Sequence, residues 1–322
     1  MGPSDSSRTI SIVEAGREGA ATSQVDRSRF LERHPCFSEP GSAGGAHLKY
    51  GRIHLPVSPR CNLGCLFCAR GLRPVNDVPG VASCVLSPEE AIATLDKALE
   101  ICPDISVVGV AGPGDSLVGD EAIRTLYLAK AKYPRLLACL STNGLLLRDK
   151  AKTLAGIPID SITVTVNSLV PETLSRINAR VVLGGRAQVG LEAARALIEA
   201  QRAGIAAAAR ATKAIIKINT VLIPGLNEGE IGTIAAECAA LGASVMNILP
   251  LIPQAGMARR RAPSCEELEA ARKSASAHLD IFRHCRHCRA DAAGIMGKNQ
   301  DISRLLYGEA ARVSEAEAFS HG

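Results

Sequence analysis

The sequence predicts an α/β fold, a partial, TIM-like (β/α)6 barrel, and two observations predict it. Six short runs rich in apolar and β-branched residues recur along the chain, at 52–57, 105–111, 136–141, 161–166, 214–222 and 243–250. Helical patterns fill the gaps between these runs. Such an alternation builds right-handed βαβ units, which close fully or partly into a barrel.

The six runs are expected to be strands buried on both faces of a parallel sheet, because they are mainly apolar. The first helix is expected to begin at Ser87, where Glu90 completes a capping-box pattern. Further helices are expected at 120–133, 147–155, 184–208, 228–241 and 264–282. The expected core, 34–300, lies between a flexible leader at 1–33 and a polar tail at 301–322.

The composition predicts a globular protein of the cytoplasm. Hydrophobic residues make up 47% of the chain and charged residues 21%, which is ordinary for such a protein. No apolar run approaches the roughly 18 residues that cross a bilayer, and the polar N-terminus lacks the apolar core of a secretory signal. The net charge of +5 is a weak excess, and aromatic residues are only 3% with no Trp. Neither a nucleic acid nor a membrane is therefore expected as a partner.

The chain contains eleven cysteines, and their clustering indicates metal or redox chemistry, because disulfides are rare in a reducing cytoplasm. Cys102, Cys238 and Cys265 lie in helix-like sequence and are expected to be small hydrophobic residues. That interpretation does not suit the group at 61, 65 and 68 or the pair at 285 and 288.

The segment CNLGCLFC carries Cys61, Cys65 and Cys68 directly after the first expected strand. In such barrels the chemistry lies on the loops that follow the strands. Three thiolates on one loop hold three irons of a cubane cluster and leave the fourth iron open to a ligand. A structural zinc site is the alternative, but zinc usually draws a second ligand pair from elsewhere in the chain.

This spacing resembles the radical S-adenosylmethionine (radical SAM) superfamily. The resemblance implies that the open iron binds the methionyl amine and carboxylate, and that electron transfer to the sulfonium releases a 5′-deoxyadenosyl radical. It also implies that the AGPGD segment, with Gly112 and Gly114, lies against the methionyl amine. The cofactor contacts implied elsewhere are Phe67 for the adenine and Asn167, Lys217 and Asn219 for the ribose and carboxylate. Without the resemblance, a GPGD segment and polar strand ends have ordinary structural roles.

A narrower resemblance, to the NifB family of nitrogenase cofactor maturases, covers residues 34 to about 300. It rests on HPCF at 34–37, AHLKYGRIHLPVSPRCN at 46–62, VPGVASCVLSPEEA at 78–91, GVAGPGDSL at 109–117, CLSTNGL at 139–145, KINTVLIPGLNE at 217–228 and HCRHCRADAAGIMG at 284–297. The family implies an enzyme that fuses two accessory [4Fe–4S] clusters into an eight-iron, nine-sulfur core with a central carbide. The carbide derives from the methyl group of S-adenosylmethionine. The partners implied are an electron donor such as ferredoxin or flavodoxin, an iron–sulfur cluster donor, and a carrier that accepts the product.

Cys285 and Cys288 form a C-x2-C pair among basic residues, and positive charge favours the metal-binding thiolate. By resemblance these two cysteines hold one accessory cluster, and Cys36 or a histidine, His47 or His54, completes its ligands. A small zinc knuckle or a redox pair is the alternative.

Cys139 lies at the end of an expected strand, from which its side chain can point into the mouth of the barrel. By resemblance it binds the second accessory cluster and accepts the methyl group. From composition alone, a cysteine in a strand is usually buried packing.

One departure from the family pattern concerns the second accessory cluster. Family members carry another cysteine shortly after the triplet, where this sequence has Pro74 in ARGLRPVNDVPGV. Cys84 is the nearest substitute. Two other functions therefore stay open: a radical SAM enzyme that acts on a peptide or small metabolite, and an iron–sulfur scaffold without radical chemistry.

Overall fold

The computed structural model describes residues 30, 32–35, 45–69, 80–283, 288–295, 298 and 300–307. The strands are β1 (Gly51–His54), β2 (Leu63–Cys65), β3 (Ile105–Val110), β4 (Leu137–Thr142), β5 (Ser161–Thr165), β6 (Asn178–Leu183), β7 (Arg186–Gln188), β8 (Ile215–Leu222), β9 (Val245–Pro250), β10 (Asp280–Phe282), β11 (Ala293–Ile295) and β12 (Gln300–Asp301). The α-helices are α2 (Ala46–Lys49), α3 (Pro88–Ile101), α4 (Glu121–Lys132), α5 (Leu147–Ala155), α6 (Pro171–Ile177), α7 (Gly190–Ala211), α8 (Ile231–Ala240), α9 (Cys265–Ser276) and α10 (Ser303–Tyr307). Short 3-10 turns cover Glu228–Glu230 and Ala255–Met257.

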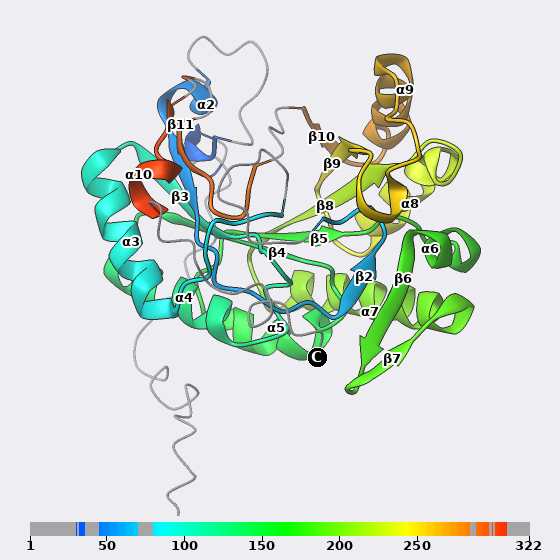
Figure 1. Ribbon diagram of the computed structural model, residues 1–322, viewed down its shortest axis with the longest axis horizontal. Coiled ribbons are helices and arrows are strands. Elements are labelled where there is room, and N and C mark those ends of the chain that lie inside the picture. Colours follow the sequence, from blue (N-terminus) through cyan, green and yellow to red (C-terminus); the bar gives the residue numbers. More distant parts are fainter. Residues whose placement is uncertain are drawn as a thin grey trace, which may run out of the picture.

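The main sheet has the strand order β10-β9-β8-β5-β4-β3-β1-β11-β12. Its strands β1, β3, β4, β5, β8 and β9 are the six that the sequence predicts, and they pair in parallel in chain order. The sheet curves with helices outside it, and the order does not return from β9 to β1 (Figure 1). The predicted partial barrel is confirmed.

Alternate residues of the strands face two different environments. One set packs under the helices in the main core, as Ile162 and Val164 of β5 and Ile216 and Ile218 of β8 do. The other set faces the barrel interior and is partly polar. The expected burial on both faces is found for nearly all residues of β1, β3 and β5. In β8, by contrast, buried and partly exposed residues alternate, because its inner face lines a cavity.

Most helices agree with the prediction, but one differs at its start and another at its end. Ser87 accepts a hydrogen bond from the Glu90 backbone N–H, and the Glu90 carboxylate accepts one from the Ser87 N–H, so the predicted capping box is present. The helix expected at 264–282 ends at Ser276, and Asp280–Phe282 pairs with β9 as an added parallel strand. The helix expected from 184 begins only at Gly190.

The residues before Gly190 build a second, three-stranded sheet of order β2-β6-β7. Gly184 and Gly185 both have positive φ angles, 54° and 75°, which glycine adopts without strain, and they turn β6 back into β7. Strand β2 belongs to the cysteine loop and pairs antiparallel with β6, Cys65 opposite Asn178. This small sheet supports the cysteine loop from the side.

Both ends of the expected core extend beyond its predicted limits. Phe30 is fully buried against Val107 and Leu137, although residue 30 falls within the expected leader. Strand β12 and helix α10 pack beside β11, and Tyr307 is buried, although this segment falls within the expected tail. No helix in the described part of the chain has both the length and the apolar character needed to span a membrane.

Candidate active site

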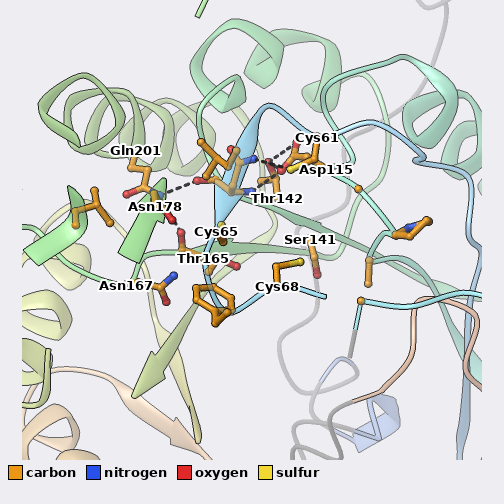
Figure 2. A pocket seen from close by; sticks show the side chains of 18 residues that line it. Cys61, Cys65, Cys68, Asp115, Ser141, Thr142, Thr165, Asn167, Asn178 and Gln201 are labelled. Atoms are coloured by element: carbon orange, nitrogen blue, oxygen red, sulfur yellow. Dashed lines mark hydrogen bonds between the residues drawn. The ribbon is translucent and has the colours of Figure 1, made fainter. Parts of the chain in front are cut away.

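The three predicted cysteines line one cavity of about 180 Å³ at the strand ends. We call it the cysteine cavity; its lining residues are Cys61, Leu63, Cys65, Phe67, Cys68, Gly80, Ala111, Pro113, Gly114, Asp115, Ser141, Thr142, Asn143, Thr165, Asn167, Leu174, Asn178 and Gln201. All three cysteines are partly exposed, and none is in a disulfide. Figure 2 shows them with Asp115 and Thr142 on one side and Gln201 and Asn178 on the other.

The glycine-containing loop that follows β3 lies directly against the chain that leads into the cysteine loop. The Gly114 N–H donates to the Ser58 carbonyl at 2.5 Å, and the Asp115 N–H donates to the Arg60 carbonyl at 2.7 Å. A Cβ atom on Gly114 would lie only 2.0 Å from the Arg60 oxygen. Only glycine fits at 114 at this short distance. Glycine at 112 serves a different purpose, because its φ of 138° is a backbone conformation that other residues rarely adopt.

Buried Asp115 connects this loop to the one after β4. Its carboxylate accepts hydrogen bonds from the Thr142 hydroxyl at 3.0 Å and from the Asn143 backbone N–H at 2.6 Å. The Asn143 side chain then donates to the Asn62 side-chain oxygen at 2.6 Å. Three strand-end loops are thus tied together around the thiols. Sequence analysis missed Asp115 and Asn143, although both stand beside motifs that it identified.

A larger cavity of about 340 Å³ occupies the barrel interior. We call it the barrel chamber; its lining residues include His34, Arg52, His54, Cys139, Ser161, Thr163, Lys217, Asn219, Asn247, Phe282 and Cys288. It shares Phe67, Cys68, Gly80, Ala111, Ser141 and Thr165 with the cysteine cavity. The two cavities therefore adjoin, and a group in one can reach the other.

Two histidines in the chamber, one buried (His34) and one partly buried (His54), are held neutral. Burial, and next the positive charge of Arg52, lowers the pKa of His54 to about 4. Its Nδ1 lies 3.0 Å from the Arg289 carbonyl; because a carbonyl only accepts, Nδ1 carries the proton and Nε2 keeps a lone pair. Burial likewise places the pKa of His34 well below its ordinary value, and His34 Nε2 lies 3.2 Å from the Cys139 sulfur. Sequence analysis did not single out His34.

The chamber also contains two positively charged side chains, one of them beside a cysteine sulfur. Arg52 donates to the Cys288 sulfur at 3.2 Å and to the Gly294 carbonyl at 3.0 Å. Lys217 lies over the Phe282 ring, 5.4 Å from its centroid. Cys139 is in the middle of β4 and lines this chamber, not the cysteine cavity.

The other predicted residues are distributed as follows. Asn167 lines the cysteine cavity, and its side-chain oxygen accepts from the Val221 N–H at 2.9 Å. Asn219 lines the chamber and accepts from Asn247 at 3.2 Å. His47 lines neither cavity. Cys36, Pro74 and Cys285 lie outside the described residues.

One expectation about the other cysteines is wrong, and one stays a prediction. Cys102 and Cys238 are buried as expected, but Cys265 is exposed at the first turn of α9. Cys84 is buried, lines neither cavity, and has its pKa raised to about 11 by burial and by the negative charge of Asp291. A thiol in this state is a poor substitute for the missing cysteine ligand.

The donor set in the cysteine cavity fits a cubane cluster with a bound cofactor better than a single ion. Within the described residues, no three His, Cys, Asp or Glu side chains converge on one ion position, as a mononuclear zinc site requires. A cubane instead takes each thiolate on a different iron. Gln201 and Asn178 also present buried oxygens to this cavity that have no partner in the described part of the chain.

Comparison with known proteins agrees with the site. Residues 55–238 match the family model of the Radical SAM superfamily. FeMo cofactor biosynthesis protein NifB of Methanocaldococcus infernus is 45% identical over 284 residues, 88% of this chain and 91% of that protein. The protein of the same name from Methanocaldococcus jannaschii is 44% identical, over 89% of this chain and 95% of that one. A radical SAM methyltransferase structure from Sphaerobacter thermophilus shares the fold, with a TM-score of 0.50 at 19% identity, over 71% of this chain and 64% of that one.

The parallel barrel and the cysteine trio at its mouth define the class as a radical SAM iron–sulfur enzyme, which uses a [4Fe–4S] cluster with S-adenosylmethionine. The similarity to the two Methanocaldococcus proteins extends over nearly the whole chain. The chain belongs to the NifB family.

Proposed function

We propose that this protein fuses two [4Fe–4S] clusters, bound as substrates, into an eight-iron, nine-sulfur core whose central carbide derives from the methyl group of S-adenosylmethionine. When bound, the cluster of the cysteine cavity with S-adenosylmethionine supplies the radical that this reaction needs. The product is the precursor of the nitrogenase cofactor. The names of the NifB relatives, which refer to FeMo cofactor biosynthesis, support the proposal.

The observation that carries the proposal is the chamber that adjoins the cysteine cavity and contains metal ligands of its own. Cys139 and Cys288 present sulfur, and His54 presents an unprotonated Nε2. Arg52 and Lys217 add positive charge, which favours anionic iron–sulfide substrates.

Within this proposal the chain's residues have distinct roles. Cys61, Cys65 and Cys68 hold the radical cluster, and Phe67, Gly112, Gly114, Asn167, Lys217 and Asn219 surround the cofactor. Cys285 and Cys288, with Cys36 or His54, hold one substrate cluster. Cys139 holds the second and accepts the methyl group, and His34 lies beside it, with Nε2 3.2 Å from the Cys139 sulfur. A low-potential ferredoxin or flavodoxin, a cluster donor and a product carrier are the proposed partners.

The test is anaerobic reconstitution followed by iron quantification and a methyl-transfer assay. Wild-type protein should bind more than one four-iron cluster per chain and take up label from methyl-labelled S-adenosylmethionine. Cys139→Ala should lose the uptake and keep the radical cluster, because residue 139 lies in the chamber. Cys238→Ala is the matched control, since Cys238 is buried at 1% exposure in the outer core.

Each failure has a separate meaning. Unchanged methyl uptake in Cys139→Ala would remove Cys139 from the proposed mechanism. A single four-iron cluster per chain would favour a radical SAM enzyme of another substrate, in line with Pro74 at the expected cysteine. Full cluster loading without 5′-deoxyadenosine formation would favour a scaffold.

A further inference from the structure

Two amide oxygens in the cysteine cavity lack hydrogen-bond partners within the part of the chain that the structure describes. They are Oε1 of Gln201 and Oδ1 of Asn178. Gln201 is 2% exposed and Asn178 is 6% exposed, and both line the cavity. A buried acceptor left unpaired is costly, so buried polar atoms nearly always have a partner. These two oxygens therefore call for donors on a bound molecule.

The orientation of the Gln201 amide is fixed by its nitrogen. Nε2 donates to the Asn143 carbonyl at 2.7 Å and to the Thr165 carbonyl at 2.8 Å, bonds drawn in Figure 2. Turning the amide over would place its oxygen against two carbonyl oxygens, which cannot donate. Oε1 is therefore the atom that remains for a ligand.

The fold places both residues next to the thiols by close backbone approaches. Gln201 lies on the buried stripe of α7, and the turn after β4 comes so near that a Cβ on Gly144 would lie 3.2 Å from Gln201 Cγ. A Cβ on Gly204 would lie 3.1 Å from the Gly144 oxygen. Asn178 is the first residue of β6 and pairs in register with Cys65.

We propose that Gln201 and Asn178 accept hydrogen bonds from the two ribose hydroxyls of S-adenosylmethionine. In that molecule the sugar lies between the adenine and the sulfonium, and its neighbouring hydroxyls offer two donors for two acceptors. Phe67 provides a ring for the adenine, and the cysteine trio lies at the amino-acid end. Asn167 is less suited to accept from the ribose, because its oxygen already accepts from Val221. The inference rests on the cofactor site of the proposed function and not on the substrate clusters.

Binding measurements with sugar analogues test this assignment. Anaerobic calorimetry on cluster-loaded protein compares S-adenosylhomocysteine with its 2′-deoxy and 3′-deoxy forms. Wild-type protein should bind each deoxy form about tenfold more weakly, as expected for one lost hydrogen bond. The quantity compared is the dissociation constant of each deoxy form divided by that of S-adenosylhomocysteine. In Gln201→Met this ratio should fall to about one for one deoxy form, and in Asn178→Leu it should fall to about one for the other. A purely structural role would weaken all three ligands equally and leave both ratios unchanged.

Thr125→Ala is the control for general destabilisation. Thr125 is fully buried and donates to the Glu121 carbonyl at 2.7 Å, within α4 and away from both cavities; this variant should keep both ratios. Unchanged ratios in both Gln201→Met and Asn178→Leu would overturn the inference while leaving the cofactor site intact. A further outcome is that the two variants instead lose their discrimination against an analogue of S-adenosylhomocysteine that lacks the 6-amino group of the adenine. That result would assign the two acceptors to the base and would also overturn the inference. Failure of wild-type protein to bind S-adenosylhomocysteine at all would reject the cofactor site itself.

Discussion

The sulfur of Cys84 is held as a neutral thiol by its surroundings. Burial and the nearby negative charge of Asp291 raise its pKa to about 11, so at neutral pH the thiolate that binds metal is scarce. Asp291 is fully buried beside it, paired with Arg289 at 2.8 Å and accepting from the Ser83 N–H at 2.5 Å. Cys84 is therefore part of the packing between the 80–84 segment and the loop before β11.

Cys84→Ala should therefore leave the iron content of the reconstituted protein unchanged. Only a packing loss is expected, lowering the free energy of unfolding by about 1 kcal/mol. Cys65→Ala, by contrast, should lose iron, because Cys65 lines the cysteine cavity. Iron quantification on both variants checks this; a clear loss of iron in Cys84→Ala would restore Cys84 as a ligand.

At the scale of elements, the site depends on how closely two strand-end loops approach. The loop after β3 forms a bridge between Pro113 and Ser58, and Gly114 is in contact with the Arg60 carbonyl. The neighbour is backbone, which cannot move aside as the end of a flexible side chain can. The position of the cysteine loop is therefore coupled to the absence of a side chain at 114.

Gly114→Ala should lower the free energy of unfolding by about 3 kcal/mol, the upper part of the range for overpacked sites, and should reduce iron loading. Gly229→Ala is the matched control, since nothing lies within 4 Å of a Cβ built there; its effect should stay within about 0.5 kcal/mol. Denaturant unfolding and iron analysis give both quantities. Equal stability of the two variants would show that the loops can move apart freely.

The six parallel strands were predictable because each is a compact apolar run, and the first helix because its capping box is local. The added strand Asp280–Phe282 was not, since its three residues are strand only through pairing with Val245–Asn247. The small sheet was missed for a similar reason. Residues 184–188 continue an apparently helical sequence, and only the two glycines at 184 and 185 signal the turn.

For the whole molecule, the C-terminal segment extends the main sheet beyond β1. Strand β11 pairs antiparallel with β1, and β12 pairs antiparallel with β11. The Tyr307 hydroxyl donates to the His54 carbonyl at 2.9 Å, which connects α10 to the strand that carries a proposed cluster ligand. Burial raises the pKa of Tyr307 well above its ordinary value, so the hydroxyl stays protonated and able to donate.

Tyr307→Phe should lower the free energy of unfolding by about 1 kcal/mol, the value of one buried hydrogen bond. Tyr127→Phe is the control, because Tyr127 is 45% exposed and its change should have almost no effect. Chemical unfolding of the two variants side by side measures the difference. Identical curves would mean that the segment contributes nothing to stability through this contact.

The site was predictable where a motif is continuous in sequence, as with Cys61, Cys65, Cys68 and Gly114. It was not predictable where long-range folding alone makes the neighbours. Gln201, on a helix far along the chain, reaches the cysteines only because two glycines let α7 approach the turn after β4. His34 meets Cys139 across 105 residues, and no spacing rule relates the two.

The central claim is that the cysteine trio holds a cluster to which S-adenosylmethionine binds. The most direct measurement is electron paramagnetic resonance of the anaerobically reduced protein, with and without S-adenosylmethionine, compared with a variant in which Cys61, Cys65 and Cys68 are all alanine. The account predicts a [4Fe–4S] signal that changes on addition of S-adenosylmethionine in the wild type, and no such change in the variant. A wild-type signal that is indifferent to S-adenosylmethionine, or a response that survives in the triple variant, would contradict it.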